Sequence, residues 1–261
     1  MLVLYEHPLS PYAQKVKISL REKNVPFELA TPDAIGSGQS GGDFLKANPR
    51  GEVPALIHDG FAIFDSTPML EYVEDAWPTP PMLPADPKDR ARVRMLEDVC
   101  DTHYEAINWG LGEIAYFRRA EGALADTLKA AAADQTAKLN TWLTDQLGDR
   151  EWFNGESFGW GDLSVAPYVR GAIGFGNGPA KGSPLSAWFE RVSARPTVSQ
   201  TFQEADASIS GMQMVSDILD QGLFKREYRD HRLEWMIKSG GIQVVIDGLG
   251  KDNIRFSNDF A

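Results

Sequence analysis

Hydrophobic and polar positions at the start of the chain predict one short strand that leads directly into a helix. The apolar run at residues 2–5 has the length and composition of a strand. Ser10 and Pro11 follow it, and these residue types favour the N-cap and the first position of a helix. Apolar residues then recur at helical spacing as far as Asn24, and Pro26 blocks continuation of the helix. We therefore expect a turn from strand to helix at Ser10.

Three further short segments, Phe27-Glu28-Leu29 and the apolar runs at 55–57 and 62–64, predict the other strands of a small sheet. Asp59-Gly60 stands between the last two runs and is a strong signal for a β-hairpin. Residues 32–42 are rich in Gly and Ser, which predicts a surface loop. A second helix is expected after the hairpin, and the resulting order of strands and helices predicts a thioredoxin-like fold with a mixed sheet of four strands.

A proline-rich segment at 77–87 separates this pattern from the rest of the chain. It holds five prolines in eleven residues, which no helix or central strand can accommodate. Beyond it the apolar positions follow helical periodicity alone. The predicted organisation is an α/β domain at 1–76, a linker at 77–87, an all-helical bundle domain at 88–205 and a helical extension at 206–261.

Two long helices are expected in the second domain. One begins at Asp86-Pro87, and Gly110 and Gly112 weaken the pattern towards its far end. The other covers 125–147 and ends at Gly148. Shorter helices are expected from about 155 to 167 and from 184 to 192, and in the extension at 228–238 and 242–249.

Composition and charge narrow the range of functions. The 261 residues carry a net charge of −11, and a protein that binds nucleic acid or an anionic membrane surface needs a basic face. Cys100 is the one cysteine, so a disulfide framework and a cysteine zinc site are excluded. The four histidines show no ligand spacing, and we predict no metal site. The absence of a signal-like or membrane-spanning apolar segment favours a cytoplasmic protein.

Candidate chemistry centres on Ser10. The first N–H groups of a helix have no partners within the helix, and with the helix dipole they favour an anion or a thiolate beside a hydroxyl at this position. The simpler interpretation is that Ser10 is only an N-cap. Since Ala13 and Ser10 occupy the places where thioredoxin-like proteins carry cysteines, a thiol would have to arrive with a ligand.

Two further segments could complete such a site. A cis peptide between Val53 and Pro54 would turn the Val53 backbone outward, where it could pair with an extended peptide; a trans proline that simply starts a strand is the alternative. Asp65 and Ser66 stand at the start of the second helix, although both residue types are common helix caps. In the predicted fold, these segments and the Ser10 turn converge.

These segments resemble the superfamily of soluble glutathione transferases over roughly residues 1–205. The Ser10 turn is similar to that of serine-type classes, and the surroundings of Phe158-Gly159-Trp160 are similar to bacterial members. The matching segments are Ser10-Pro11-Tyr12, Asn48 to Leu56, Asp65-Ser66-Thr67, Gly155 to Asp162, and Trp188 to Pro196.

The resemblance implies an enzyme in which Ser10 donates a hydrogen bond to the glutathione thiolate. It also implies that Val53, followed by Pro54, pairs with the cysteinyl backbone, and that Asp65 and Ser66 hold the γ-glutamyl group. Glutathione is then the co-substrate, a small apolar electrophile is the other partner, and the protein is a homodimer that acts in detoxification. Some classes use a Tyr at the end of the first strand, so Tyr5 is the rival donor.

The electrophile pocket is expected to use Tyr12 and residues of the first long helix. These are Tyr104, Ile107, Asn108 and Leu111, although such a stripe is also typical of a simple core. Gly159 stands where the family usually has Ser or Thr three residues before Asp162, so Asp162 is expected to bond the backbone of the turn. The extension 206–261 is expected either to cover the site as a lid or to pack against outer helices or a partner subunit.

Two functions of different class follow from this reading. One is a glutathione transferase that conjugates an electrophile or displaces a group from it, as in dehalogenation or ether cleavage. The other is a non-catalytic relative that keeps the fold as an interaction or regulatory protein. The joint presence of Ser10, Val53, Asp65 and Ser66 favours the enzyme, because a scaffold has no need for a converging anion and peptide site.

Overall fold

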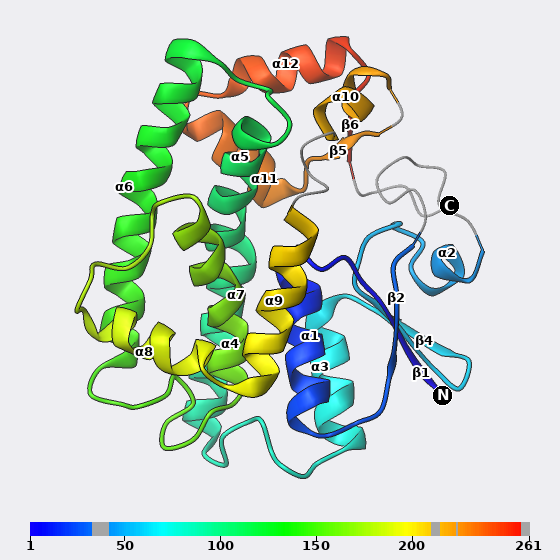
Figure 1. Ribbon diagram of the computed structural model, residues 1–261, viewed down its shortest axis with the longest axis vertical. Helices are drawn as coiled ribbons and strands as arrows, with labels where there is room; N and C mark the ends of the chain where they lie inside the picture. Colours follow the sequence, from blue (N-terminus) through cyan, green and yellow to red (C-terminus); the bar gives the residue numbers. More distant parts are fainter. Residues whose placement is uncertain (33–41, 210–214, 223, 257–261) are drawn as a thin grey trace.

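The computed structural model describes residues 1–32, 42–209, 215–222 and 224–256. Most of the loop predicted at 32–42 lies outside the described residues. A sheet and the helices packed on it form one part of the molecule, and a larger group of helices forms the other (Figure 1). The predicted fold class, a thioredoxin-like domain followed by a helical domain, is confirmed.

The sheet has the strand order β2-β1-β3-β4. β1 pairs in parallel with β2, whereas the β1–β3 and β3–β4 pairs are antiparallel. Asp59 and Gly60, with φ of 49° and 87°, form the predicted hairpin turn. The strands are β1 (Leu2–Tyr5), β2 (Glu28–Ala30), β3 (Ala55–His58) and β4 (Phe61–Phe64).

Two helices, α1 (Pro11–Glu22) and α3 (Ser66–Ala76), lie side by side between the sheet and the helical domain (Figure 1). Asn24, with φ of 53°, takes the left-handed conformation that ends the α1 segment, as the sequence predicts. The short helix α2 (Asp43–Ala47) lies on the other side of the sheet (Figure 1). The amino end of α1 therefore points to the boundary between the two domains.

The first long helix of the second domain runs through three segments without leaving helical geometry. These are α4 (Pro87–Val99), the π-helical turn η1 (Cys100–Tyr104) and α5 (Glu105–Ala115). Gly110 does not end this helix: a side chain at Gly110 would collide with the ring of Trp235, so glycine lets the extension pack closely on the helix. The other helices are α6 (Gly122–Leu147), α7 (Trp160–Gly174), α8 (Pro184–Ser193) and α9 (Pro196–Ile209).

Asp162, in the first turn of α7, organises the turn before that helix. Its carboxylate accepts hydrogen bonds from the backbone N–H groups of Phe153 and Gly159 and from the Trp188 indole, at 2.8, 3.1 and 2.8 Å. The prediction that Asp162 bonds the backbone of this turn is confirmed. A side chain at Gly159 would collide with Asn154, which explains the absence of a Ser or Thr cap there.

The extension folds back onto α5 and α6 rather than forming a separate unit (Figure 1). Trp235 and Met236 are fully buried in a second hydrophobic core that includes Ala106 and Leu128. Besides the predicted helices it holds a parallel pair of short strands that sequence periodicity did not indicate. Its elements are α10 (Val215–Asp220), β5 (Arg226–Glu227), α11 (Asp230–Lys238), α12 (Ile242–Gly250) and β6 (Ile254–Arg255).

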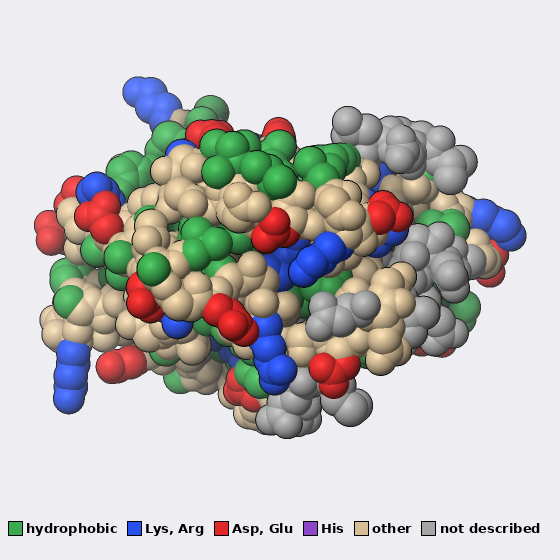
Figure 2. Space-filling model, turned by 90° about the horizontal axis from the view of Figure 1, so that it is seen from above, with side chains coloured by type: hydrophobic (Ala, Val, Ile, Leu, Met, Phe, Trp, Pro, Cys, Tyr) green, Lys and Arg blue, Asp and Glu red, His purple; other side chains and the backbone are tan. Residues whose placement is uncertain are grey.

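The outer surface at the α12 end mixes both charge signs with groups of hydrophobic side chains (Figure 2). Ile242, Ile246 and Leu249 of α12 are exposed there. None of the described helices is long and apolar enough to cross a membrane.

Candidate active site

A cleft of about 640 Å³ lies between the two domains. One side is formed by the start of α1, the segment before β3 and the start of α3. The other side is formed by α5, α7, α9 and the extension around β5. The cleft therefore brings together segments from both ends of the chain.

Ser10 lines the cleft at the start of α1. Its Oγ accepts a hydrogen bond from the N–H of Ala13 at 3.3 Å, so Ser10 is an N-cap. This bond uses a lone pair of the oxygen and leaves the hydroxyl proton free to be donated. The two interpretations of Ser10, as a helix cap and as a donor to a ligand, are therefore compatible.

Val53 and Pro54 line the cleft just before β3, and the peptide between them is cis. The N–H and C=O of Val53 pair with no other backbone group in the described part of the chain. Asn48 holds this segment by donating a hydrogen bond to the Glu52 carbonyl at 2.7 Å. An extended peptide could pair with the exposed backbone of Val53.

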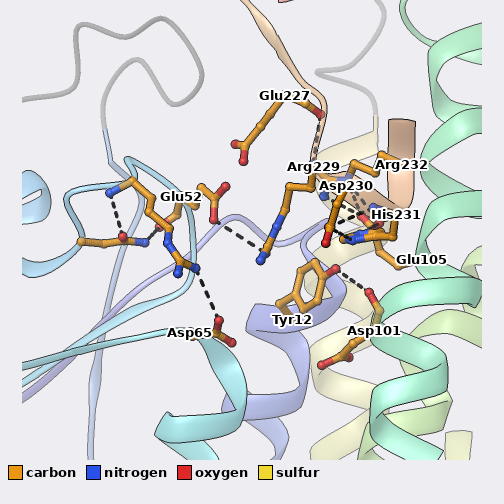
Figure 3. Close-up of polar contacts among 12 residues, drawn as sticks. Tyr12, Glu52, Asp65, Asp101, Glu105, Glu227, Arg229, Asp230, His231 and Arg232 are labelled. Atoms are coloured by element: carbon orange, nitrogen blue, oxygen red, sulfur yellow. Dashed lines mark hydrogen bonds and ion pairs between the residues drawn. The ribbon is translucent and has the colours of Figure 1, made fainter. Parts of the chain in front are cut away.

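Asp65 and Ser66 stand where β4 turns into α3, and both line the cleft. Asp65 has φ of 74°, a strained conformation for a residue with a side chain, and such strain is concentrated at functional sites. Its side chain does not cap α3; instead it lies 3.5 Å from the Arg50 guanidinium (Figure 3). Ser66 is only 2% exposed, yet its hydroxyl has no hydrogen-bond partner among the residues that the structure describes. Buried hydroxyls are normally bonded, so Ser66 has the capacity to bind a ligand.

Of the residues expected to form the electrophile pocket, Tyr12 and Asn108 line the cleft. The Tyr12 hydroxyl donates to the Asp101 carbonyl at 2.8 Å (Figure 3). The Asn108 amide donates to the Tyr168 carbonyl at 2.9 Å. Both side chains are thus fixed in place by bonds to the helical domain.

The other three expected pocket residues do not line the cleft, and the prediction was wrong for them. Tyr104 is fully buried and donates its hydroxyl hydrogen bond to Asn140 at 2.8 Å. Ile107 and Leu111 belong to the hydrophobic core formed with the extension. For Ile107 and Leu111 the reason is that α11 packs on α5 and covers that face, whereas Tyr104 lies in the main core and faces α6.

Tyr5, the rival donor, does not line the cleft. Its ring packs against Phe44, with 5.6 Å between the ring centroids. Of the two candidate donors, Ser10 and Tyr5, only Ser10 therefore lines the cleft.

A buried ion cluster attaches α1 to the helical domain beside the cleft. The Lys15 ammonium lies 2.7 Å from Glu97 and 2.6 Å from Asp101. Burial raises the pKa of the Asp101 carboxyl to about 6, although the neighbouring Lys15 charge and a bond from Tyr168 act in the opposite direction. This cluster was not predicted, because Lys15 is more than 80 residues away from the two carboxylates in the sequence.

The extension supplies cleft residues that sequence reasoning missed. Arg229 reaches across the cleft, where its guanidinium lies 3.8 Å from Glu52 in the first domain (Figure 3). Arg232 and His231 bind the buried Glu105 of α5, at 2.6 and 2.9 Å (Figure 3). Four Lys and Arg residues fall within 225–232, but nothing local in the sequence indicates that they face carboxylates elsewhere in the chain.

Glu105 is held strongly in its ionised form. Burial alone would raise its pKa, but the charge of Arg232 and the hydrogen bonds from His231 and Arg232 outweigh burial and lower the pKa to about 2. The extension is thus attached to α5 beside the cleft by a carboxylate that stays charged over the physiological range. No group of three or more His, Cys, Asp or Glu residues in the described chain could hold a metal ion.

Comparison with known proteins identifies the family. Residues 4–81 match the family "Glutathione S-transferase, N-terminal domain". Glutathione S-transferase 1 of Dianthus caryophyllus is 30% identical over 179 residues, covering 66% of this chain and 78% of that protein. The chain belongs to the glutathione S-transferase superfamily.

Other relatives agree with this assignment, and the protein is a glutathione transferase. Glutathione S-transferase U28 of Arabidopsis thaliana is 29% identical over 78% of this chain and 90% of that protein. A glutathione S-transferase structure from Rhodospirillum rubrum superposes with a TM-score of 0.67 at 27% identity, covering 77% of this chain and 91% of that one. The structure of a rice transferase in complex with glutathione also has a TM-score of 0.67 and 27% identity, and covers 83% and 98% of the two chains.

Proposed function

We propose that this transferase activates the thiol of glutathione at Ser10. The supporting observation is a hydroxyl that caps α1 through its oxygen and faces the cleft with a proton free to be donated. A hydrogen bond from that hydroxyl, together with the N-terminal pole of α1, would stabilise a thiolate and lower the pKa of the thiol. Ser10 is the residue that we assign as catalytic.

The rest of the tripeptide would bind along the first domain. The unpaired backbone of Val53, held by the turn at Pro54, fits the cysteinyl backbone in the antiparallel manner of an added strand. Asp65 would pair with the γ-glutamyl ammonium, and the Ser66 hydroxyl would bond its carboxylate. The unpartnered, buried hydroxyl of Ser66 supports this assignment most directly.

The second substrate would be an apolar electrophile bound against the helical domain and the extension. The thiolate sulfur attacks an electrophilic carbon and forms a C–S bond. The leaving group then departs with its electron pair, or, in an addition, the neighbouring carbon takes up a proton. Aromatic side chains on this side of the cleft support the proposal, including Trp109, Tyr116, Phe117 and Phe175.

The domains would divide this work. Residues 1–76 would bind glutathione, residues 88–205 and the extension 206–261 would bind the electrophile, and 77–87 would link them. We also propose that the protein acts in the cytoplasm, in detoxification, as a homodimer in which the first domain packs on the helical domain of its partner. Exposed Phe61 on the edge strand β4 and exposed Met95 on α4 support such an interface.

Calorimetric titration with glutathione tests the central proposal. We expect one binding site per chain, and light scattering on the same sample is expected to give twice the 28.8 kDa mass of one chain. No heat of binding at millimolar glutathione would contradict the proposed thiol chemistry, whereas a mass of one chain would contradict only the dimer.

A further inference from the structure

One arginine on the electrophile side of the cleft shares its neighbouring carboxylate with a second arginine. Positive charge is therefore in excess at this place. Arg226, in β5, lies over the rings of Phe117, Trp109 and Phe224, with its guanidinium carbon 3.7, 5.4 and 5.7 Å from their centroids. Its backbone is fixed by the pairing of β5 with β6. The strand pairing therefore fixes where the Arg226 side chain leaves the backbone, unlike a side chain on a free surface segment.

The carboxylate beside Arg226 is shared with a second arginine. Glu113 of α5 is 1% exposed and accepts a hydrogen bond from Arg226. The same carboxylate lies 3.3 Å from the guanidinium of Arg119. One negative charge therefore faces two positive charges in a buried place, and a surplus buried charge is unfavourable unless an anion joins it.

The hydrogen-bonding capacity of the two arginines differs. Arg119 directs its terminal nitrogens to Asn253 and to the Val244 carbonyl, at 3.0 and 3.2 Å. The Arg226 side chain bonds only Glu113, through Nε, within the described part of the chain. Its two terminal NH₂ groups are therefore the donors that remain available, and Arg226 lines the cleft.

The other arginines of the extension already have carboxylates of their own. Arg229 lies 3.8 Å from Glu52, Arg232 is paired with Glu105 at 2.6 Å, and Arg255 is paired with Glu227 at 2.7 Å. The surplus positive charge of this region therefore lies at the Arg226 group rather than being spread around the cleft. That group is on the wall formed by α5 and the extension, opposite the Ser10, Val53 and Ser66 segments that we assign to glutathione.

We propose that the second substrate of this transferase is an aromatic electrophile that carries a carboxylate. Its ring lies against Trp109, Phe117 and Phe224, and its carboxylate accepts hydrogen bonds from the terminal NH₂ groups of Arg226. This inference rests on the proposed function, since it names the class of electrophile that meets the glutathione thiolate. A planar guanidinium is well suited to a bidentate bond with a carboxylate.

A matched pair of chloroarenes tests the proposal: 4-chloro-3-nitrobenzoate and its methyl ester. In both, the thiolate forms a C–S bond at the chlorine-bearing carbon, and chloride leaves with the electron pair. Each kcat/KM is divided by the rate constant of the uncatalysed reaction with glutathione, and the acid-to-ester ratio is compared between proteins. In Arg226→Met, Glu113 keeps Arg119 as its partner, so no carboxylate is left unpaired.

We expect the acid-to-ester ratio to fall about tenfold to a hundredfold in Arg226→Met, with partial recovery in Arg226→Lys. Lys225→Met is the matched control, because Lys225 also lines the cleft but is paired with Asp252 at 2.8 Å. Its ratio should stay near that of the wild type. An equal fall in both substrates, an unchanged ratio, or an equal effect of Lys225→Met would overturn the proposal.

Binding to the wild-type protein provides a test that needs neither turnover nor a variant. With glutathione saturating, calorimetry should show 3-nitrobenzoate binding at least about tenfold more tightly than 3-nitrobenzamide. Equal affinities would overturn the proposal. If Arg226→Met instead weakened glutathione binding, Arg226 would serve the tripeptide and this assignment would be wrong. Failure of the proposed function itself is distinct, because glutathione would then not bind the wild-type protein at all.

Discussion

The two sides of the cleft are built in different ways. The side that we assign to glutathione consists of three short turns within the first 66 residues, and it offers backbone groups, two serine hydroxyls and the Asp65 carboxylate. The electrophile side joins residues that are 113 and 127 positions apart, through Arg226 with Glu113 and Arg232 with Glu105. The first side therefore depends on local turn geometry, whereas the second depends on where the extension packs.

Loss of the Glu105 carboxylate should be the strongest single disruption of the electrophile side. Glu105→Gln leaves Arg232 and His231 buried beside a neutral amide, and breaking a buried pair in this way destabilises a protein by about 3–5 kcal/mol. We expect a correspondingly lower melting temperature. Glu234→Gln is the control, since its pair with Lys238 on α11 is exposed and should contribute less than about 1 kcal/mol.

Acid should reduce the difference between wild type and Glu105→Gln. The Glu105 pKa is about 2 in the folded protein and near its usual 4.5 in the unfolded chain. The carboxylate therefore stabilises the fold fully above about pH 4.5, and this contribution is lost as the pH falls towards 2. The unfolding free energies of the wild type and of Glu105→Gln, measured from pH 7 to pH 3, should converge as the pH falls. A constant difference across that range would show that the ionisation of Glu105 is not the source.

The contrast between the two sides also explains what the sequence could predict. Ser10, with Pro11 after it, predicts a capped helix because these residue types are preferred at helix starts. Asp59-Gly60 predicts a hairpin in the same way, because these residue types are preferred in hairpin turns. The pairing of Glu105 with Arg232 has no local signal, because either residue alone is typical of a solvated helix face. The electrophile side of the cleft could not be predicted from the sequence because its residues are far apart along the chain, not because they lack chemical function.

The errors in the helical domain have the same origin. Ile107 and Leu111 form an apolar stripe, and a stripe is equally consistent with a ligand pocket and with a covering helix. Only the position of α11 decides between these. Gly110 is a similar case. In the sequence it only weakens the helical pattern, and its packing against the ring of Trp235 becomes visible only in the structure.

Ser10→Ala should have the largest effect on the glutathione side. The change removes one hydrogen bond to a charged sulfur while the N-terminal pole of α1 remains, so kcat should fall by about one to two orders of magnitude. Glutathione affinity should fall much less, because Val53, Asp65 and Ser66 are unchanged. Stopped-flow measurement of the thiolate absorbance over pH should show a raised thiol pKa in the complex.

Two controls separate the roles of Ser10. Ser183→Ala removes the same kind of cap, since Ser183 precedes Pro184 and accepts a hydrogen bond from the Ser186 N–H at 3.2 Å. Both serine variants should lose about 1 kcal/mol of stability, but only Ser10→Ala should lose turnover. Tyr5→Phe should leave turnover unchanged. If Tyr5→Phe abolished turnover and Ser10→Ala did not, Tyr5 would be the donor and Ser10 only a cap.

Ser66→Ala should give the smallest effect and separates ligand binding from stability most cleanly. The Ser66 hydroxyl is buried without a partner in the described part of the chain, so its removal breaks no hydrogen bond there, and the melting temperature should stay level or rise slightly. Glutathione affinity measured by calorimetry should fall about tenfold, the lower end of the range for one hydrogen bond to a charged group. Ser164→Ala is the matched control, because its hydroxyl is also buried and unpartnered but lies outside the cleft lining. That variant should leave glutathione affinity unchanged, and an equal loss of affinity in both would mean that Ser66 acts through the fold rather than by contact with the γ-glutamyl group.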